Sequence, residues 1–207
     1  MFIEMRKYKF LFFAVVIIAG VFLFINHKET IAPKVFLRSH KIGDKLDSLH
    51  GVVVFYNGSV SHSGKRNIST DGYNIGMQYQ CVEFVKRYYY EYYHHKMPDS
   101  YGNAKDFFNN TLADGVYNGN RDLLQYRNSS KAKPQQGDLV IMDATRFNPY
   151  GLVAIVSNVT NNSVEIIQQN PGPAALSRVK YDLQYRKNLW RIDNARILGW
   201  LRMKTKN

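Results

Sequence analysis

The sequence predicts an α+β domain, with helices first and an antiparallel sheet second, preceded by one transmembrane helix. Three observations lead to this fold class. A continuous apolar run fills residues 10–25 and follows several basic residues. After Gly76, apolar side chains recur every three or four residues, which is typical of a helix. From residue 139 onward, short runs rich in Val and Ile alternate with turn residues, as in strands joined by hairpins.

The apolar run at residues 10–25 is the expected membrane anchor. It is slightly shorter than the roughly 17–25 residues of a spanning helix, and Tyr8 and Lys9 can extend it at the headgroups. The basic residues before it favour a cytoplasmic N-terminus. A cleaved signal peptide is the alternative, although no small-x-small cleavage site follows the run. The sequence thus predicts a single-pass protein of the inner (cytoplasmic) membrane, whose C-terminal domain is extracytoplasmic, in the periplasm or at the cell surface.

The sequence divides into three expected parts. Residues 1–25 are expected as a cytoplasmic basic end and anchor, residues 26–50 as a tether and lead-in, and residues 51–205 as the folded domain.

The net charge of the chain indicates which classes of partner it could bind. The chain has 28 Lys and Arg against 16 Asp and Glu, a formal net charge of +12. Such charge attracts anionic polymers, including nucleic acids. Because no zinc-ligand spacing or ribonucleoprotein motif accompanies it, we expect no nucleic-acid partner.

The elements of the domain follow in chain order from periodicity and turn signals. A strand is expected at residues 51–56, then a long Ser/Gly/Asn-rich loop to residue 75 that indicates a binding loop or flap. Two helices follow, and residues 112–136 read as irregular. The expected helices cover about 81–95 and 103–110, and the later strands cover 139–142, 151–156, 163–168 and 197–202.

The first helix carries the only cysteine of the chain in its first turn. Its apolar face contains Cys81, Phe84, Val85 and Tyr88, and the opposite face is polar. Free backbone N–H groups and the helix dipole at a helix start favour a thiolate and can bind an oxyanion. Cys81 is therefore a candidate nucleophile, and the alternative is a small buried residue beneath the helix. A single unpaired thiol in an oxidising compartment favours the chemical role.

Four sequence pieces in order resemble the CHAP amidases, a family with a papain-like fold. They are Gln80-Cys-Val-Glu-Phe-Val-Lys-Arg87, Gly137-Asp-Leu-Val-Ile141, Gly151-Leu-Val-Ala-Ile-Val156 and Gln168-Gln-Asn170. The helix motif is most similar to the amidase domains of glutathionylspermidine and trypanothione synthetase/amidases. The resemblance covers roughly residues 51–202 and refines the predicted fold to a papain-like CHAP fold. It implies neither a cofactor nor a metal.

The resemblance also implies a set of site residues. Cys81 would be the nucleophile, and its backbone N–H would form an oxyanion hole with the side-chain amide of Gln80. The family's general base is a histidine at the second position of the Gly-His-Val-Ala strand, and here Leu152 occupies that position. A residue that orients the imidazole is expected on the next strand, where this chain has Gln168, with Asn170 nearby.

Leucine at the histidine position should impair this chemistry. It can neither accept the thiol proton nor protonate a leaving amine, and losing general acid–base catalysis typically costs on the order of 10²–10⁴ in rate. Among the other histidines of the chain, only His62, in the long loop before the helix, is a possible substitute base; the alternative for it is a solvated loop residue.

The expected function is therefore an exported, membrane-anchored CHAP-family cysteine amidase or peptidase that is impaired in amide-bond hydrolysis. Its expected partners are the membrane, through residues 10–25, and an amide ligand, either a peptidoglycan peptide or a glutathione–polyamine conjugate. The impairment has two interpretations, a natural pseudoenzyme or a substituted version of an active enzyme. Whether the chain is an enzyme thus stays open, and the alternative function is an inactive module that binds cell-wall peptide.

Overall fold

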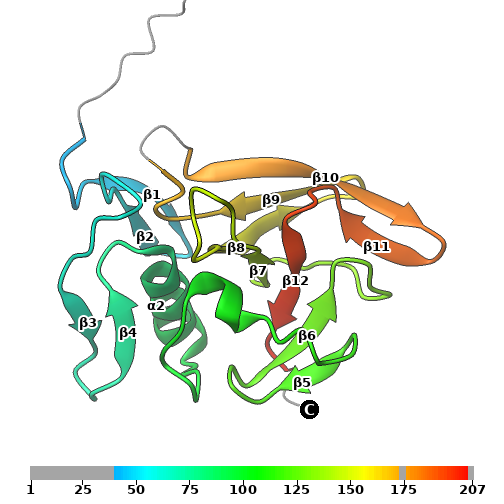
Figure 1. Ribbon diagram of the computed structural model, residues 1–207, viewed down its shortest axis with the longest axis horizontal. Coiled ribbons are helices and arrows are strands. Elements are labelled where there is room, and N and C mark those ends of the chain that lie inside the picture. The colour runs from blue at the N-terminus through cyan, green and yellow to red at the C-terminus, as the bar shows by residue number, and fades with distance from the viewer. Residues whose placement is uncertain (1–39, 173–175, 205–207) are drawn as a thin grey trace, which may run out of the picture. The chain divides into compact units, whose positions relative to one another are not determined.

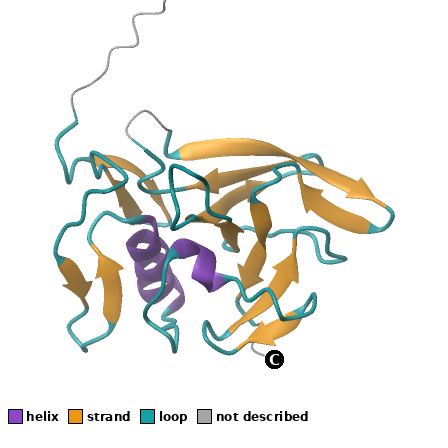
Figure 2. Ribbon diagram, viewed as in Figure 1, coloured by secondary structure: helices purple, strands orange, loops and turns teal. Residues whose placement is uncertain are grey.

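The computed structural model describes residues 40–172 and 176–204 of the chain. Strands predominate within these residues, together with one α-helix and one short 3₁₀ helix (Figure 2). The helices are Cys81–Tyr93 (α2) and Ala104–Phe107 (η1). The first four strands are Lys45–Leu49 (β1), Val52–Phe55 (β2), Arg66–Ile68 (β3) and Asn74–Met77 (β4). The others are Val116–Asn118 (β5), Leu123–Arg127 (β6), Leu139–Met142 (β7), Leu152–Val159 (β8), Ser163–Ile167 (β9), Arg178–Arg186 (β10), Leu189–Ile192 (β11) and Ile197–Arg202 (β12).

One eight-stranded antiparallel sheet organises the domain (Figure 1). Its strand order is β11-β10-β9-β8-β7-β12-β6-β5, so the neighbours β7, β8 and β9 lie in its interior. These central strands are almost continuously apolar and buried, as expected for strands covered on both faces. Two separate hairpins, β1–β2 and β3–β4, complete the β structure.

Helix α2 packs against β8, β2 and β4 (Figure 1). Its apolar residues Phe84, Val85 and Tyr88 are fully buried, in agreement with the predicted apolar face. Glu83, Lys86 and Arg87 from the opposite face are buried as well. The helix is therefore covered on more sides than its amphipathic pattern indicates, because the hairpins β1–β2 and β3–β4 also pack against it.

The predicted fold class needs correction. The described residues are mostly β, and they contain one α-helix rather than N-terminal helices packed on a sheet. The second expected helix, at 103–110, is a single 3₁₀ turn, and the segment 112–136 that read as irregular contains β5 and β6. Short strands such as β5, with two exposed residues of three, lack the alternation by which strands are recognised.

The predicted membrane helix and the predicted location also need correction. No helix within residues 40–172 and 176–204 is long and apolar enough to cross a membrane. The structure therefore does not support the transmembrane helix or the single-pass location in the inner membrane. The segment 10–25, on which both predictions rested, lies outside the described residues.

Gly76 brings the backbone of β4 against the first turn of α2. It has φ of +135°, and a Cβ there would lie 3.1 Å from the Cα of Glu83 and 3.3 Å from its backbone nitrogen. We expect Gly76→Ala to lower the free energy of unfolding by about 2 kcal/mol, because it combines unfavourable φ with a clash that moves the helix start. Urea denaturation measures the change.

Gly72→Ala is the matched control, since Gly72 also has a positive φ, of +82°, but a Cβ added there would have no atom within 4 Å. The difference between the two variants isolates the contact with α2. Equal losses of stability would show that the contact contributes nothing.

Candidate active site around Cys81

A pocket with a volume of about 460 Å³ lies at the start of α2. Several segments that are distant in the sequence form its wall, including the loop before β3, the turn between β4 and α2, the segment before η1 and the loop before β8. Cys81, Gln80 and Asn170 are among the lining residues. The fold thus brings three of the predicted site residues to one cavity.

Cys81 is the first residue of α2, and its side chain is buried. Burial raises the pKa of its thiol above the usual value, while the backbone N–H groups of Val153, Val82 and Cys81 itself act in the opposite direction. The helix start was expected to favour the thiolate. Desolvation outweighs that influence, because a charged sulfur loses more solvation in this apolar setting than three N–H groups return.

We expect Cys81 in the folded protein to react slowly with iodoacetamide at neutral pH and to accelerate only at strongly alkaline pH. The reason is that the thiolate is the reactive form and its pKa is raised. The rate of alkylation, followed by mass spectrometry across pH, gives the midpoint. The same chain unfolded in denaturant should titrate near the ordinary value of about 8.5. A folded-state midpoint below about 7 would instead indicate an activated thiolate.

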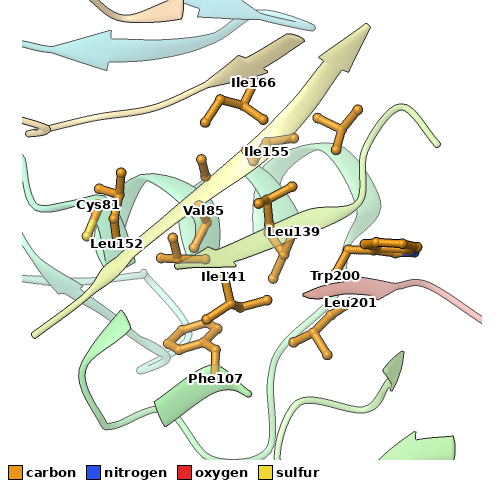
Figure 3. Packing of buried hydrophobic residues seen from close by; sticks show 14 of the residues in the cluster. Cys81, Val85, Phe107, Leu139, Ile141, Leu152, Ile155, Ile166, Trp200 and Leu201 are labelled. Atoms are coloured by element: carbon orange, nitrogen blue, oxygen red, sulfur yellow. The ribbon is translucent and has the colours of Figure 1, made fainter. Parts of the chain in front are cut away.

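Leu152 lies at the start of β8, next to Cys81. Both side chains belong to the same buried cluster, and they lie near each other in the view of Figure 3. The backbone N–H of the following residue, Val153, is close enough to the sulfur to lower the pKa of the thiol. The side chain beside the sulfur is therefore a hydrocarbon, which can exchange no proton with it.

Gln80 and Asn170 are joined at the pocket wall. The Nδ2 of Asn170 donates to Oε1 of Gln80 at 2.9 Å, and Nε2 of Gln80 donates to the backbone carbonyl of His62. The Gln80 amide is thus held at both ends beside the Cys81 backbone N–H. A fixed amide N–H₂ group in this position has one hydrogen left with which it could meet an oxyanion.

Three of the predicted site residues, His62, Gln168 and Leu152, are not among the described residues that line the pocket. The loop containing His62 reaches the site through its backbone carbonyl, and its neighbours Ser61 and Ser63 line the pocket whereas His62 does not. The amide of Gln168 donates to the carbonyl of Leu176 at 2.9 Å, and Gln168 does not line the pocket either.

Gln169, which was not among the predicted site residues, links three segments beneath the site. Its Nε2 donates to the carbonyl of Gln80 and to Oε2 of Glu83, both at 3.0 Å, and its Oε1 accepts from the Phe55 N–H at 2.7 Å. Gln168 and Gln169 directly follow β9, and the first amide donates to the carbonyl of Leu176 whereas the second reaches α2. Nothing local in the sequence shows which of the two reaches α2.

Glu83 is a second buried polar residue that joins the first turn of α2 to neighbouring segments. Its Oε1 accepts from Nε of Arg87 at 2.7 Å and from Nδ2 of Asn67 at 3.0 Å. Arg87 also donates to the carbonyl of Val53 in β2. The network holds the first turn of α2, and hence Cys81, against β2, β3 and the end of β9.

Few of the described side chains that line the pocket are titratable. Among the described residues that line it, none is His, Asp or Glu, and the titratable side chains are Arg66, Cys81, Tyr101 and Tyr150. The part of the chain that the structure describes also contains no group of His, Cys, Asp or Glu able to hold a metal ion. The described lining residues thus include one thiol and several amide groups, but no imidazole or carboxylate.

Comparison with known proteins found a match to one family model and partial similarity to several proteins. Residues 71–170 match the model of the CHAP domain, a stretch that includes Cys81, Leu152 and Asn170. The chain contains a CHAP domain. Trypanothione synthetase of Crithidia fasciculata is 29% identical to this chain over 150 residues, which cover 67% of the chain and 23% of that protein. The chain therefore spans less than a quarter of the length of this relative.

Two solved structures are also similar in part. The crystal structure of Ly7917 with the hydrolyzing product of MDP is 27% identical, with a TM-score of 0.27 over 36% of this chain and 30% of that one. The wild-type endolysin LysIME-EF1 is 18% identical, with a TM-score of 0.37 over 70% of this chain and 60% of that one. The match to the CHAP domain supports an amidase-like or peptidase-like function.

Proposed function

We propose that this CHAP domain binds an amide-containing ligand in the pocket at Cys81 and that its hydrolysis of that ligand is strongly impaired. Cys81 would be the nucleophile, attacking the amide carbonyl to form a thioester. The Cys81 backbone N–H and the Gln80 amide would stabilise the oxyanion. Asn170 would hold Gln80 in position. The ligand would be a peptide or a glutathione–polyamine conjugate, as the resemblance to the CHAP amidases and the similarity to trypanothione synthetase suggest.

The observation that carries the proposal is the absence of a proton acceptor among the described residues lining the pocket. The thiol proton has to leave before sulfur attacks, and the leaving amine has to receive a proton before it departs. Leu152 can do neither, and burial keeps the thiol protonated at neutral pH. Binding and oxyanion stabilisation would depend on other groups, so the lack of a base would not remove them.

The test combines binding and turnover in the full-length chain. A cell-wall peptide and glutathionylspermidine are each added, and protection of Cys81 from iodoacetamide reports binding while chromatography reports cleavage. We expect at least one ligand to protect Cys81, with cleavage far below the ordinary range of about 1–10³ s⁻¹. Turnover within that range would contradict impairment, and a lack of protection by both ligands would contradict ligand binding at this pocket.

A module that only binds its ligand is the second candidate, favoured by the same lack of a base. It differs from an impaired amidase in one measurable respect. If protection of Cys81 is intact but cleavage by the wild-type chain equals that of Cys81→Ala, the binding module is the better description. Slow cleavage that disappears in Cys81→Ala favours the impaired amidase.

A further inference from the structure

One end of the pocket carries a positive charge without a carboxylate partner. Arg66, in β3, is the only charged side chain among the described residues that line the pocket. Its Nη1 donates to Oδ1 of Asn74 at 3.0 Å, and its guanidinium carbon lies 5.7 Å from the centre of the Tyr101 ring. Within the described residues no carboxylate forms an ion pair with it, in contrast to the pairs made by Arg87, Arg178 and Arg202.

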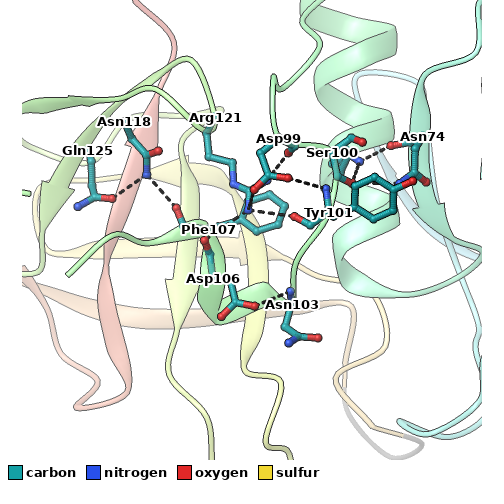
Figure 4. Close-up of polar contacts among 11 residues, drawn as sticks. Asn74, Asp99, Ser100, Tyr101, Asn103, Asp106, Phe107, Asn118, Arg121 and Gln125 are labelled. Carbon is teal, nitrogen blue, oxygen red and sulfur yellow. Dashed lines mark hydrogen bonds and ion pairs between the residues drawn. The ribbon is translucent and has the colours of Figure 1, made fainter. Parts of the chain in front are cut away.

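Two further cations, Lys86 and Arg121, are buried and donate to backbone carbonyls of residues that line the pocket. Nζ of Lys86 donates to the carbonyl of Ser100 at 2.7 Å, and Nη2 of Arg121 donates to the carbonyl of Tyr101 at 3.2 Å. Figure 4 shows Arg121 beside Asp99 and the segment that contains Ser100 and Tyr101, a segment that lines the pocket. Lys86 and Arg121 are 0% and 1% exposed.

The acidic groups nearby only partly balance these charges. A carboxylate oxygen of Asp99 lies 3.8 Å from Arg121, and the carboxylate of Asp106 accepts a hydrogen bond from the backbone N–H of Asn103. Burial, together with repulsion from Arg121 and Arg66, lowers the pKa of Lys86 to about 8, against an opposing influence of Asp99. Lys86 is thus mostly protonated at neutral pH, and three cations face two acids around the segment 99–103.

We propose that this end of the pocket binds a carboxylate of the ligand and that Arg66 is the residue that holds it. The inference rests on the proposed function, because it assigns a chemical feature to the amide ligand of the same pocket. A guanidinium presents a planar set of donors that matches a carboxylate. With Nη1 bonded to Asn74, Nε and Nη2 remain for the ligand. The pocket lining also includes the hydroxyl groups of Ser61 and Ser63. A cationic group, such as the amine of a polyamine, would be repelled from this end.

The test uses two peptides that differ in one group, acetyl-Ala-D-Glu-Ala-amide and acetyl-Ala-D-Gln-Ala-amide, with the full-length chain. The dissociation constants come from isothermal titration calorimetry at low and at moderate salt. We expect the Glu peptide to bind about tenfold more tightly than the Gln peptide, because a charge-assisted hydrogen bond is lost in the second. The preference should decrease at higher salt.

The variants assign the preference to Arg66. Arg66→Ala should abolish the difference between the peptides, and Arg66→Lys should retain part of it. Lys65→Ala is the matched control, since it removes the same charge from the neighbouring exposed residue, which does not line the pocket, and should retain the full preference.

The outcomes separate this inference from the proposed function. Equal binding of both peptides, or a preference that survives Arg66→Ala, would overturn the carboxylate site and leave ligand binding at Cys81 intact. If neither peptide binds and neither protects Cys81 from alkylation, peptide binding at the pocket fails and the carboxylate site fails with it.

Discussion

Replacing Leu152 by histidine should raise the rate of amide hydrolysis on the order of 10² over the wild-type chain. Residue 152 lies beside the sulfur, so an imidazole there would take the thiol proton, stabilise the thiolate as an ion pair and return the proton to the leaving amine. General acid–base catalysis contributes about 10²–10⁴. We expect the lower end, because no carboxylate among the described lining residues can orient the new imidazole. Release of product from a cell-wall peptide and from glutathionylspermidine measures the gain.

Two controls make this result specific. Leu152→Gln introduces a polar side chain that accepts no proton at neutral pH, and it should leave the rate at the wild-type level. Adding Cys81→Ala to Leu152→His should remove the gained activity. A histidine variant that folds normally but gains nothing with either substrate would refute the assignment of residue 152 as the vacant base position.

Removal of the Glu83 carboxylate should destabilise the domain by about 3–5 kcal/mol, the range for breaking a buried ion pair by deleting one partner. Glu83 and Arg87 are paired at 2.7 Å with side-chain exposures of 4% and 9%. In Glu83→Ala the Arg87 cation would be left buried, and the amides of Asn67 and Gln169 would each lose an acceptor. Urea denaturation of the full-length chain measures the free energy of unfolding.

Two control variants separate the effects of charge and of burial on the free energy of unfolding. Glu83→Gln keeps an acceptor of similar size but removes the charge. We therefore expect its free energy of unfolding to lie between those of the wild type and Glu83→Ala. Lys96→Ala breaks an ion pair with Asp71 in which both side chains are exposed, and it should leave the free energy of unfolding close to the wild-type value. Since Glu83 holds the first turn of α2, its loss should also speed alkylation of Cys81. Equal effects of Glu83→Ala and Lys96→Ala would contradict the structural role.

Part of the fold and of the site could be predicted from the sequence. The helix after Gly76 begins at Cys81, and the strands expected around 139–142, 151–156 and 163–168 are present as β7, β8 and β9. Strands β10 and β11 were not predicted, because most of their residues are exposed or half-buried and the apolar pattern is weak. The sequence pattern places Glu83 on the polar face of the helix and does not reveal its burial, because its partners Gln169 and Asn67 lie outside the helix.

What the sequence determined by itself is local: the period of α2, the apolar runs of the central strands and the ordered motifs that identify a CHAP domain. These depend on residues that are close along the chain, so the pattern is visible without a fold. Only the tertiary structure decided that Glu83, Lys86 and Arg87 are buried, that desolvation raises the pKa of Cys81, and that Arg66 faces the pocket without a carboxylate partner among the described residues. The physical reason is that solvation and charge pairing depend on what distant segments cover, and the hairpins β1–β2 and β3–β4 cover a helix face that the sequence alone presents as polar.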